Sequence, residues 1–455
     1  MAGLNEKADL IVTGRRLVTP EGVRAGRVVI GGGRILAVGD APVPADAGVP
    51  VVDAGDDYVL PGLIDSHVHF RTPGLTHKED WAHGGRAAVA GGVTTVMDMP
   101  NTVPPTFTEQ DVLDKAAMVD GQSLVDFRFH IGVDPQRPQE LKHLDPAIAT
   151  SAKIFMAGHH TAPAVLNDPD ALATAFEAAA ASGTRLVLHA EDGRLFDLLD
   201  GWWGEPDGYR DYEARRPRSG GITAVAAVIE LVRRYGTAAH ILHLSSAEEA
   251  DLVCAAAAAG LPVTFEVTGH HLSFTDHDTC RTGARTRLSP AIRGRRDQDR
   301  LWEAVRHDQV ATLGSDHAPH TVAEKTRSVA QSPPGLPGVQ ELAVAVWTGM
   351  RRRFPGEPAD DAVRRLVRHL GSGPADLFGL TGKGRLAVGA DADLVFFAPE
   401  QTWMLSAAQV RSKCGWSAYE GWTMGGRVRR TYRRGALVWD AETEVFGAPD
   451  GRWVR

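Results

Sequence analysis

The chain has 455 residues, and its 49 Lys and Arg against 57 Asp and Glu leave a formal net charge of −8. A mild acidic excess without a basic stripe argues against a nucleic-acid-binding surface, and 43% hydrophobic with 23% charged residues is ordinary for a globular protein. The length allows about three domains of roughly 150 residues, or one large barrel with an accessory domain.

The cysteine and apolar patterns favour a reducing compartment. The three cysteines Cys254, Cys280 and Cys414 are too few and too scattered for a disulfide framework. The start, MAGLNEKADLIVTG, lacks the basic residues and apolar run of a signal peptide. Apolar stretches are interrupted well before the roughly 18 residues that a membrane span needs. We therefore expect a cytoplasmic protein with no membrane or nucleic-acid partner.

The first 57 residues are typical of short strands, because β-branched runs are punctuated by Gly, Pro and Asp. From about residue 58, strand-length apolar runs such as RLVLHA and PVTFEV alternate with Ala- and Leu-rich segments of helical period. Examples of these segments are DPDALATAFEAAAASG and SAEEADLVCAAAAAG. Repeated alternation of this kind indicates βαβ units around a parallel sheet.

About eight such strands predict a (β/α)8 barrel. After about residue 382 the turn-rich strand texture returns, in GRLAVGADADLVFFAP and GRVRRTYRRGALVWD. Neither end is large enough for a β-core of its own, and two separate appendages would leave strand edges exposed. We therefore expect an α/β fold in which a TIM-like barrel, 58–381, is inserted into one small β-sandwich domain made from residues 1–57 and 382–455.

Polar residues stand where several barrel strands end. His67 and His69, in HVH, follow the apolar VLPGLID. Two His at i and i+2 on a strand point the same way, here into the mouth where barrel enzymes do chemistry. His189 ends RLVLHA, His243 ends HILHL and Asp316 ends ATLGSD. Each alone could be an ordinary hydrogen-bonded residue, but together they favour Zn²⁺ or a similar divalent ion.

Lys153, in SAKIFMAG, also lies at a strand end. Its ammonium would repel metal ions, and a lysine is usually expelled from an interior or paired. A CO2-derived carbamate on Lys153 would be anionic and could bridge two metals at the roughly 3.5–4 Å spacing of two-metal sites. The alternative is a lysine whose ammonium reaches the barrel rim.

The longer motifs around these residues are DSHVHFRTPGLTHKEDWAHGG, SAKIFMAG, LVLHAED, HILHLSS, FEVTGHHL and LGSDHAPHTVAEK. In combination they resemble the cyclic amidohydrolases of the amidohydrolase superfamily, and most closely the dihydroorotases. The resemblance runs over nearly the whole chain and includes GRLAVGADADLVFF near its end. It implies a (β/α)8 barrel with a binuclear metal centre.

The resemblance also implies a role for each strand-end residue. The metal ligands it implies are His67, His69, Lys153, His189, His243 and Asp316. The first two histidines and the aspartate would hold the more buried of two divalent ions, zinc being the first expectation. The other two histidines would hold the second ion, and the lysine carbamate would bridge both. A metal-bridging hydroxide would attack the ring, with Asp316 as general base and then acid.

Four residues are expected to contact the substrate. Arg71, Asn101 and His320 match residues that hold the substrate carboxylate in dihydroorotases. Arg71 is two residues past the HVH pair, so it should share the mouth-facing side, and its planar fork suits a carboxylate. For His320 an ordinary structural role is equally open. Ser289, in RLSPAIR, stands where dihydroorotases commonly carry Asn and is more like hydantoinases and dihydropyrimidinases.

The leading interpretation is a dihydroorotase that interconverts N-carbamoyl-L-aspartate and L-dihydroorotate in pyrimidine biosynthesis. The near alternatives are allantoinase, which the tail SKCGWSAYEGWTMGGRVRRTYRRG also resembles, and hydantoinase or dihydropyrimidinase. A non-catalytic scaffold ranks below these because all the implied metal ligands are present. The partners expected are a small cyclic amide or ureide and, from the family, further copies of the chain.

Three further segments lie outside these motifs. Trp202 and Trp203 are expected to pack a helix or lid, with substrate stacking as the weaker alternative. His159 and His160 are interpreted as loop residues near the mouth. The Pro- and Gly-rich segment 329–341 is predicted to be a loop at the barrel mouth.

Overall fold

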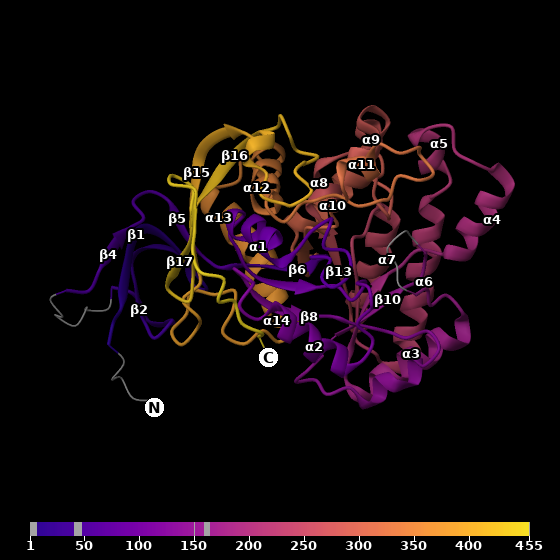
Figure 1. Cartoon of the computed structure of the whole chain (residues 1–455), viewed down its shortest axis with the longest axis horizontal. Coiled ribbons are helices and arrows are strands. Elements are labelled where there is room, and N and C mark those ends of the chain that lie inside the picture. The colour runs from indigo at the N-terminus through magenta and orange to yellow at the C-terminus, as the bar shows by residue number, and fades with distance from the viewer. Residues whose placement is uncertain (1–6, 41–47, 150, 159–163, 455) are drawn as a thin grey trace.

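A computed structural model of the protein describes residues 7–40, 48–149, 151–158 and 164–454. Two parts lie side by side in Figure 1, a β-rich part built from the indigo and yellow ends of the chain and a larger part of strands and helices between them. The larger part is a TIM-like (β/α)8 barrel and the smaller a β-sandwich domain, so the predicted fold class is confirmed. The division at residues 57 and 381 stays a prediction.

Strands from both ends of the chain form one sheet. β15 pairs antiparallel with β5, with Leu394 opposite Pro61, and β5 in turn pairs with β1. The strands of this sheet are β1 (Leu10–Thr19), β2 (Gly22–Gly31), β3 (Arg34–Gly39), β4 (Val51–Asp53), β5 (Tyr58–Pro61), β15 (Leu394–Met404), β16 (Thr423–Arg433), β17 (Ala436–Asp440) and β18 (Val445–Phe446). The pairing buries residues such as Val59 and Leu394 in a common core, which neither end could form alone.

The barrel strands pair in parallel, and each ends at the same mouth. The strands are β6 (Leu63–Val68), β7 (Val93–Asp98), β8 (Asp126–Phe129), β9 (Ile131–Gly132), β10 (Ser151–Phe155), β11 (Arg185–His189), β12 (Ala239–Ile241), β13 (Val263–Thr268) and β14 (Thr312–Gly314). β8 and β9 are separated only by His130 and together make one of the eight barrel strands. Just past β14, a parallel bridge between Val68 and His317 joins the first and last strands. This closure brings residues near 67 and 316 together although they are far apart in sequence.

Helices that follow the strands cover the barrel. They are α1 (Trp81–Ala90), α2 (Glu109–Val119), α3 (Pro169–Ser182), α6 (Arg218–Tyr235), α7 (Ala247–Ala258), α10 (Arg295–Arg306), α12 (Leu342–Arg353), α13 (Ala359–Val367) and α14 (Gly373–Phe378). In α3 the Asp168 side chain caps the start, and Gly183 ends the helix in the left-handed conformation. In the part of the chain that the structure describes, no helix combines the length and apolar character of a membrane span.

Shorter elements lie in the connections. They are α4 (Gly193–Trp203), α5 (Tyr209–Ala214), α8 (Gly269–Ser273), α9 (Asp276–Thr282), α11 (Val322–Lys325), the 3-10 turns Pro138–His143, Gly283–Thr286 and Ala407–Gln409, and a π-helical turn Arg368–Ser372. The expectation that Trp202 and Trp203 pack against the protein is wrong, because they are 68% and 49% exposed at the end of α4. The expected loop residues His159 and His160 lie outside the described residues.

Candidate metal centre

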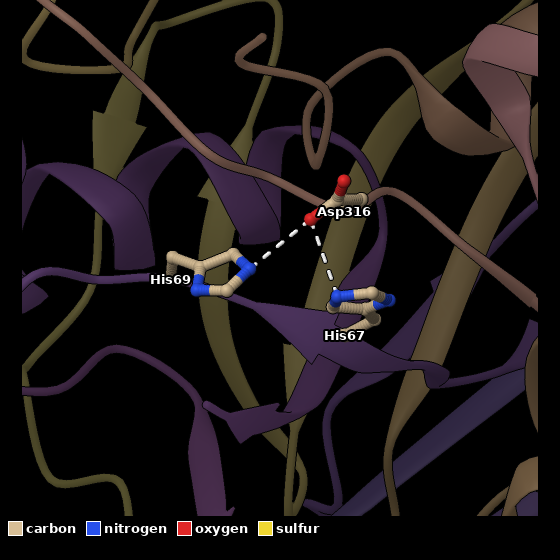
Figure 2. Close-up of side chains that lie close together, drawn as sticks. All are labelled: His67, His69 and Asp316. Atoms are coloured by element: carbon tan, nitrogen blue, oxygen red, sulfur yellow. Dashed lines mark hydrogen bonds and ion pairs between the residues drawn. The ribbon is translucent and has the colours of Figure 1, made fainter. Parts of the chain in front are cut away.

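Three side chains converge at the mouth of the barrel (Figure 2). His67 lies on β6, His69 follows one residue after its end, and Asp316 follows β14. The Nε2 atoms of His67 and His69 lie 3.2 and 3.1 Å from the same oxygen of Asp316. One potential ligand atom from each residue lies within 4.8 Å of the others, so the three together fit a divalent cation.

The opposite nitrogen of each histidine is held by a buried acceptor. His67 Nδ1 lies 2.7 Å from Oε1 of Glu266, and His69 Nδ1 lies 2.7 Å from Oδ1 of Asn101. Such contacts fix the orientation and tautomer of the ring, so that Nε2 is the nitrogen presented to a metal. The paired histidines predicted from the HVH spacing are therefore supported by side chains from β13 and from the loop after β7.

The charges of this cluster depend strongly on one another. Burial opposes ionisation of Asp316, but the adjacent His67 and His69 outweigh it and hold the pKa of the carboxyl well below its usual range. Burial also disfavours the charged form of His67, but Glu266 and Asp316 outweigh it and raise the pKa of the imidazole to about 9. A metal ion would take the place of the proton on His67, so binding should release a proton.

A second group of ligands faces the first across one cavity. His189 ends β11, and His243 lies just after β12 with a left-handed φ of 41°. Nδ1 of His189 lies 3.2 Å from Nε2 of His243. The cavity is lined by His67, His69, Lys153, Phe155, His189, His243, Ser289, Asp316, Ala318, Pro334 and Gly335. All the ligands implied by the sequence therefore line one cavity, which Pro334 and Gly335 of the predicted mouth loop help to enclose.

Lys153 points into this cavity from β10 and is 2% exposed. Burial lowers the pKa of its ammonium to about 7, although Asp316 and Glu266 act in the opposite direction. A lysine with this pKa is substantially neutral at pH 7, and only a neutral amine can add CO2. The environment therefore fits the carbamate expected from the sequence, and it excludes the alternative of a lysine that reaches the barrel rim.

Arg71 is buried beside the candidate metal ligands. Its position does not result from the side-chain alternation that was expected along a strand. The strand β6 ends at Val68, and Arg71 adopts a left-handed φ of 60°. Its side chain is 1% exposed, and none of its three guanidinium nitrogens has a hydrogen-bond partner among the described residues. Burial lowers the pKa of Arg71 to about 10, partly offset by Asp316 and Asp98. A buried guanidinium of this kind would be stabilised by an anion that binds beside it.

The other expected substrate residues differ in position. Nδ2 of Asn101 is buried and has no hydrogen-bond partner in the described part of the chain, so it is available to a ligand. Ser289 lines the cavity, and its Oγ donates to Glu191 at 3.1 Å. His320, like Arg71 and Asn101, is not among the lining residues. Its Nε2 lies 3.0 Å from the Pro334 carbonyl and its Nδ1 3.2 Å from Lys78 Nζ, so the protein already engages both nitrogens.

Buried carboxylates are the functional residues that the sequence reasoning missed. Glu266 contacts His67, Glu191 contacts His189, and Glu79 lies 3.2 Å from Nε2 of His317, the neighbour of Asp316. Glu191 and Glu266 occur in the quoted motifs LVLHAED and FEVTGHHL. A buried acid within two residues of a strand-end histidine was the available signal for Glu191.

The chain is similar to known proteins in both sequence and structure. Residues 58–438 match the model of the amidohydrolase family. The chain is 35% identical to an allantoinase of Streptomyces avermitilis over 98% of each chain, and 38% identical to a dihydroorotase of Halobacterium salinarum over 93% of this chain and 95% of that one. An L-hydantoinase (dihydropyrimidinase) from Arthrobacter aurescens superimposes with a TM-score of 0.91 at 28% identity, covering 98% of this chain and 100% of the other.

Proposed function

The chain belongs to the amidohydrolase family and is a hydrolase of cyclic amides, and from this premise we propose that its substrate is a ring bearing a carboxylate, as in dihydroorotate. In one direction the ring C–N bond is cleaved by water to give N-carbamoyl-L-aspartate. In the other direction the same bond forms with loss of water.

Arg71 carries this proposal. A wholly buried guanidinium without a hydrogen-bond partner among the described residues is costly unless a ligand supplies an anion. A ring carboxylate offers two oxygens in the geometry of the guanidinium fork. Nδ2 of Asn101 is a second buried donor without a partner among the described residues, and Oδ1 of the same side chain is bonded to His69.

The proposed centre holds two divalent ions, with zinc as the first expectation. His67, His69 and Asp316 would hold one ion, and His189 with His243 the other. The Lys153 carbamate would connect the two. When bound, the ions would supply a water of lowered pKa and a Lewis acid for the ring carbonyl. Because Asp316 is ionised beside this position, its carboxylate accepts the proton of the attacking water and returns it to the leaving ring nitrogen.

A second candidate is allantoin. Ser289 rather than Asn lines the cavity, and the allantoinase relatives match almost the full chain. On this alternative, Arg71 would have to bind a neutral carbonyl group, which compensates a buried cation less well than a carboxylate does.

The first prediction therefore concerns Arg71 and the substrate. Arg71→Met should weaken transition-state binding of dihydroorotate by about 2–5 kcal/mol, the scale for breaking a buried charge pair. Turnover of dihydrouracil, which lacks the carboxylate, should change little and serves as the internal control. The measurement is kcat/KM for dihydroorotate, allantoin, hydantoin and dihydrouracil, with Zn²⁺ and bicarbonate supplied. Faster turnover of allantoin than of dihydroorotate by the wild type would assign the second candidate.

A further inference from the structure

One carboxylate oxygen of Glu191 contacts both His189, at the end of β11, and Ser289, which lines the cavity. Glu191 is fully buried, and its Oε2 lies 2.9 Å from Nε2 of His189. The same Oε2 accepts a hydrogen bond from Ser289 Oγ at 3.1 Å. His189 and Ser289 come from segments about a hundred residues apart and both line the cavity. Glu191 itself is not a lining residue, and both hydrogen bonds of its Oε2 go to residues that are, so its effect on a ligand passes through these two neighbours.

The contact with His189 determines which nitrogen this histidine presents. A carboxylate that accepts from Nε2 requires the proton on Nε2 and leaves the lone pair on Nδ1. Nδ1 is the atom that faces His243 Nε2 at 3.2 Å, where the second ion would lie. Glu191 therefore acts on His189 as Glu266 acts on His67.

Arg293 faces the other oxygen of the carboxylate. Its Nη2 lies 3.9 Å from Oε1 of Glu191, an ion pair without a hydrogen bond. The same guanidinium donates through Nε to Ser245 Oγ at 3.3 Å and through Nη1 to the carbonyl of Arg216. Arg216 lies just after α5, at the end of the segment that contains α4 and α5. The Arg293 side chain therefore contacts this segment, the loop after β12 and Glu191.

We propose that Glu191 is a positioning residue that orients the second-metal ligand His189 and the substrate-side Ser289 together, and that Arg293 fixes its carboxylate. The inference rests on the proposed function only in requiring that a second metal binds. It predicts that metal affinity at one of the two sites and KM change together when Glu191 is altered, because one oxygen serves both contacts.

The test is a metal titration of chelator-treated protein with Co²⁺ under excess bicarbonate, read by absorption and by metal analysis. In Glu191→Gln the neutral amide is a weaker acceptor, so the second equivalent should bind about 10–100-fold more weakly while the first is unchanged. KM should rise in the same variant. Ser289→Ala should raise KM without altering either metal step. The matched control is Glu249→Gln, since Glu249 is also buried but bonds Ser245 and Ser246 instead of a histidine.

Each possible result of the metal titration tests a different part of the proposal. A wild type that binds a single equivalent would overturn both the two-metal proposal and this inference. Two equivalents in the wild type with an unchanged second step in Glu191→Gln would overturn the inference and leave the proposed function intact. Equal weakening of both steps, or the same effect in Glu249→Gln, would show a general structural role and would also overturn it.

Arg293 provides a second route if Glu191→Gln does not fold, as judged by circular dichroism. Arg293→Met should weaken the second metal step selectively, and Arg293→Lys should restore part of the affinity because an ammonium can still face Glu191. A second step unaffected in Arg293→Met would remove Arg293 from the proposal.

Discussion

At the scale of single residues, Lys153 combines deep burial with a position among the metal ligands. Lys153→Ala should lose the second metal and nearly all activity, because the bridging anion is absent. Short carboxylic acids such as acetate or propionate should restore part of the activity by supplying that anion. Metal content and kcat, with and without added acid, are the measurements. A fully active, metal-loaded enzyme with an unmodified Lys153, shown by intact mass, would contradict the carbamate.

At Asp316, the proposed role as a metal ligand and the proposed role as a general base can be tested separately. Asp316→Asn keeps an oxygen near Nε2 of His67 and His69 but cannot take a proton. We expect kcat to fall by roughly 10²- to 10⁴-fold, the usual contribution of a general base, and metal content to fall far less. Wild-type kcat in the metal-loaded variant would rule out Asp316 as the base.

The sequence predicts which strand-end side chains meet better than it predicts what supports them. His67, His69, His189, His243 and Asp316 line one cavity, as expected for strand ends at one mouth of a barrel. Arg71 is buried nearby, yet it lies in a left-handed turn that alternation along a strand does not describe. The partners of Glu266 and Glu79 could not be assigned, because they are set by the approach of segments that are distant in sequence.

At the scale of elements, strands and long helices follow from periodicity, whereas short mouth elements do not. The segment predicted as helical at DPDALATAFEAAAASG, residues 168–183, is α3 at Pro169–Ser182. The first 57 residues were predicted to form short strands, but β1 runs over ten residues, Leu10–Thr19, with a shift in register between Gly14 and Leu17. Helix α4 has apolar residues at helical spacing, but Phe196 is the only apolar side chain of this helix that is buried. Its periodicity therefore predicts a helix without predicting its exposed position.

Glu213 on helix α5 should make the stability of the folded protein depend on pH. Glu213 is half-buried as a residue, but both of its carboxylate oxygens are buried and neither has a hydrogen-bond partner among the residues described. Burial raises its pKa from 4.5 to about 8, although Arg293 and Arg287 oppose this. Between these values the folded chain holds a proton that the unfolded chain has released. Stability should therefore fall as pH rises from about 4.5 to about 8, and change no further from this group outside that window.

Glu213→Gln tests this because the amide does not titrate. The stability of the variant relative to the wild type should increase between pH 5 and pH 8, by at most about 1.4 kcal/mol per pH unit. Thermal midpoints at pH 5, 6.5 and 8 measure the difference. The exposed Glu205, replaced by Gln, is the matched control and should give a constant difference. Parallel curves for wild type and Glu213→Gln would contradict the raised pKa.

At the scale of the whole molecule, one buried lysine joins the barrel to the sheet made from both chain ends. Nζ of Lys383 lies 2.5 Å from Asp126 on β8, and 2.7 and 2.8 Å from Asp391 and Asp393, which precede β15. Lys383 is 3% exposed. Burial disfavours its charge, but the three carboxylates outweigh this and raise its pKa above the usual value. The insertion of the barrel between the two chain ends thus places a charged cluster at the junction.

Lys383→Met should be destabilising, because it removes the one cation that contacts Asp126, Asp391 and Asp393 together, although Asp126 also pairs with Arg434 and Asp391 with Arg34. Removing one partner of a buried ion pair costs about 3–5 kcal/mol, so the thermal midpoint should fall by several degrees. The junction should also be cleaved faster in limited proteolysis, since the two parts then separate more often. Arg15→Met is the control, because Arg15 pairs with Asp56 on the exposed surface of the same sheet and should leave the midpoint unchanged. Equal midpoints for Lys383→Met and Arg15→Met would show that apolar packing alone holds the barrel to the terminal sheet.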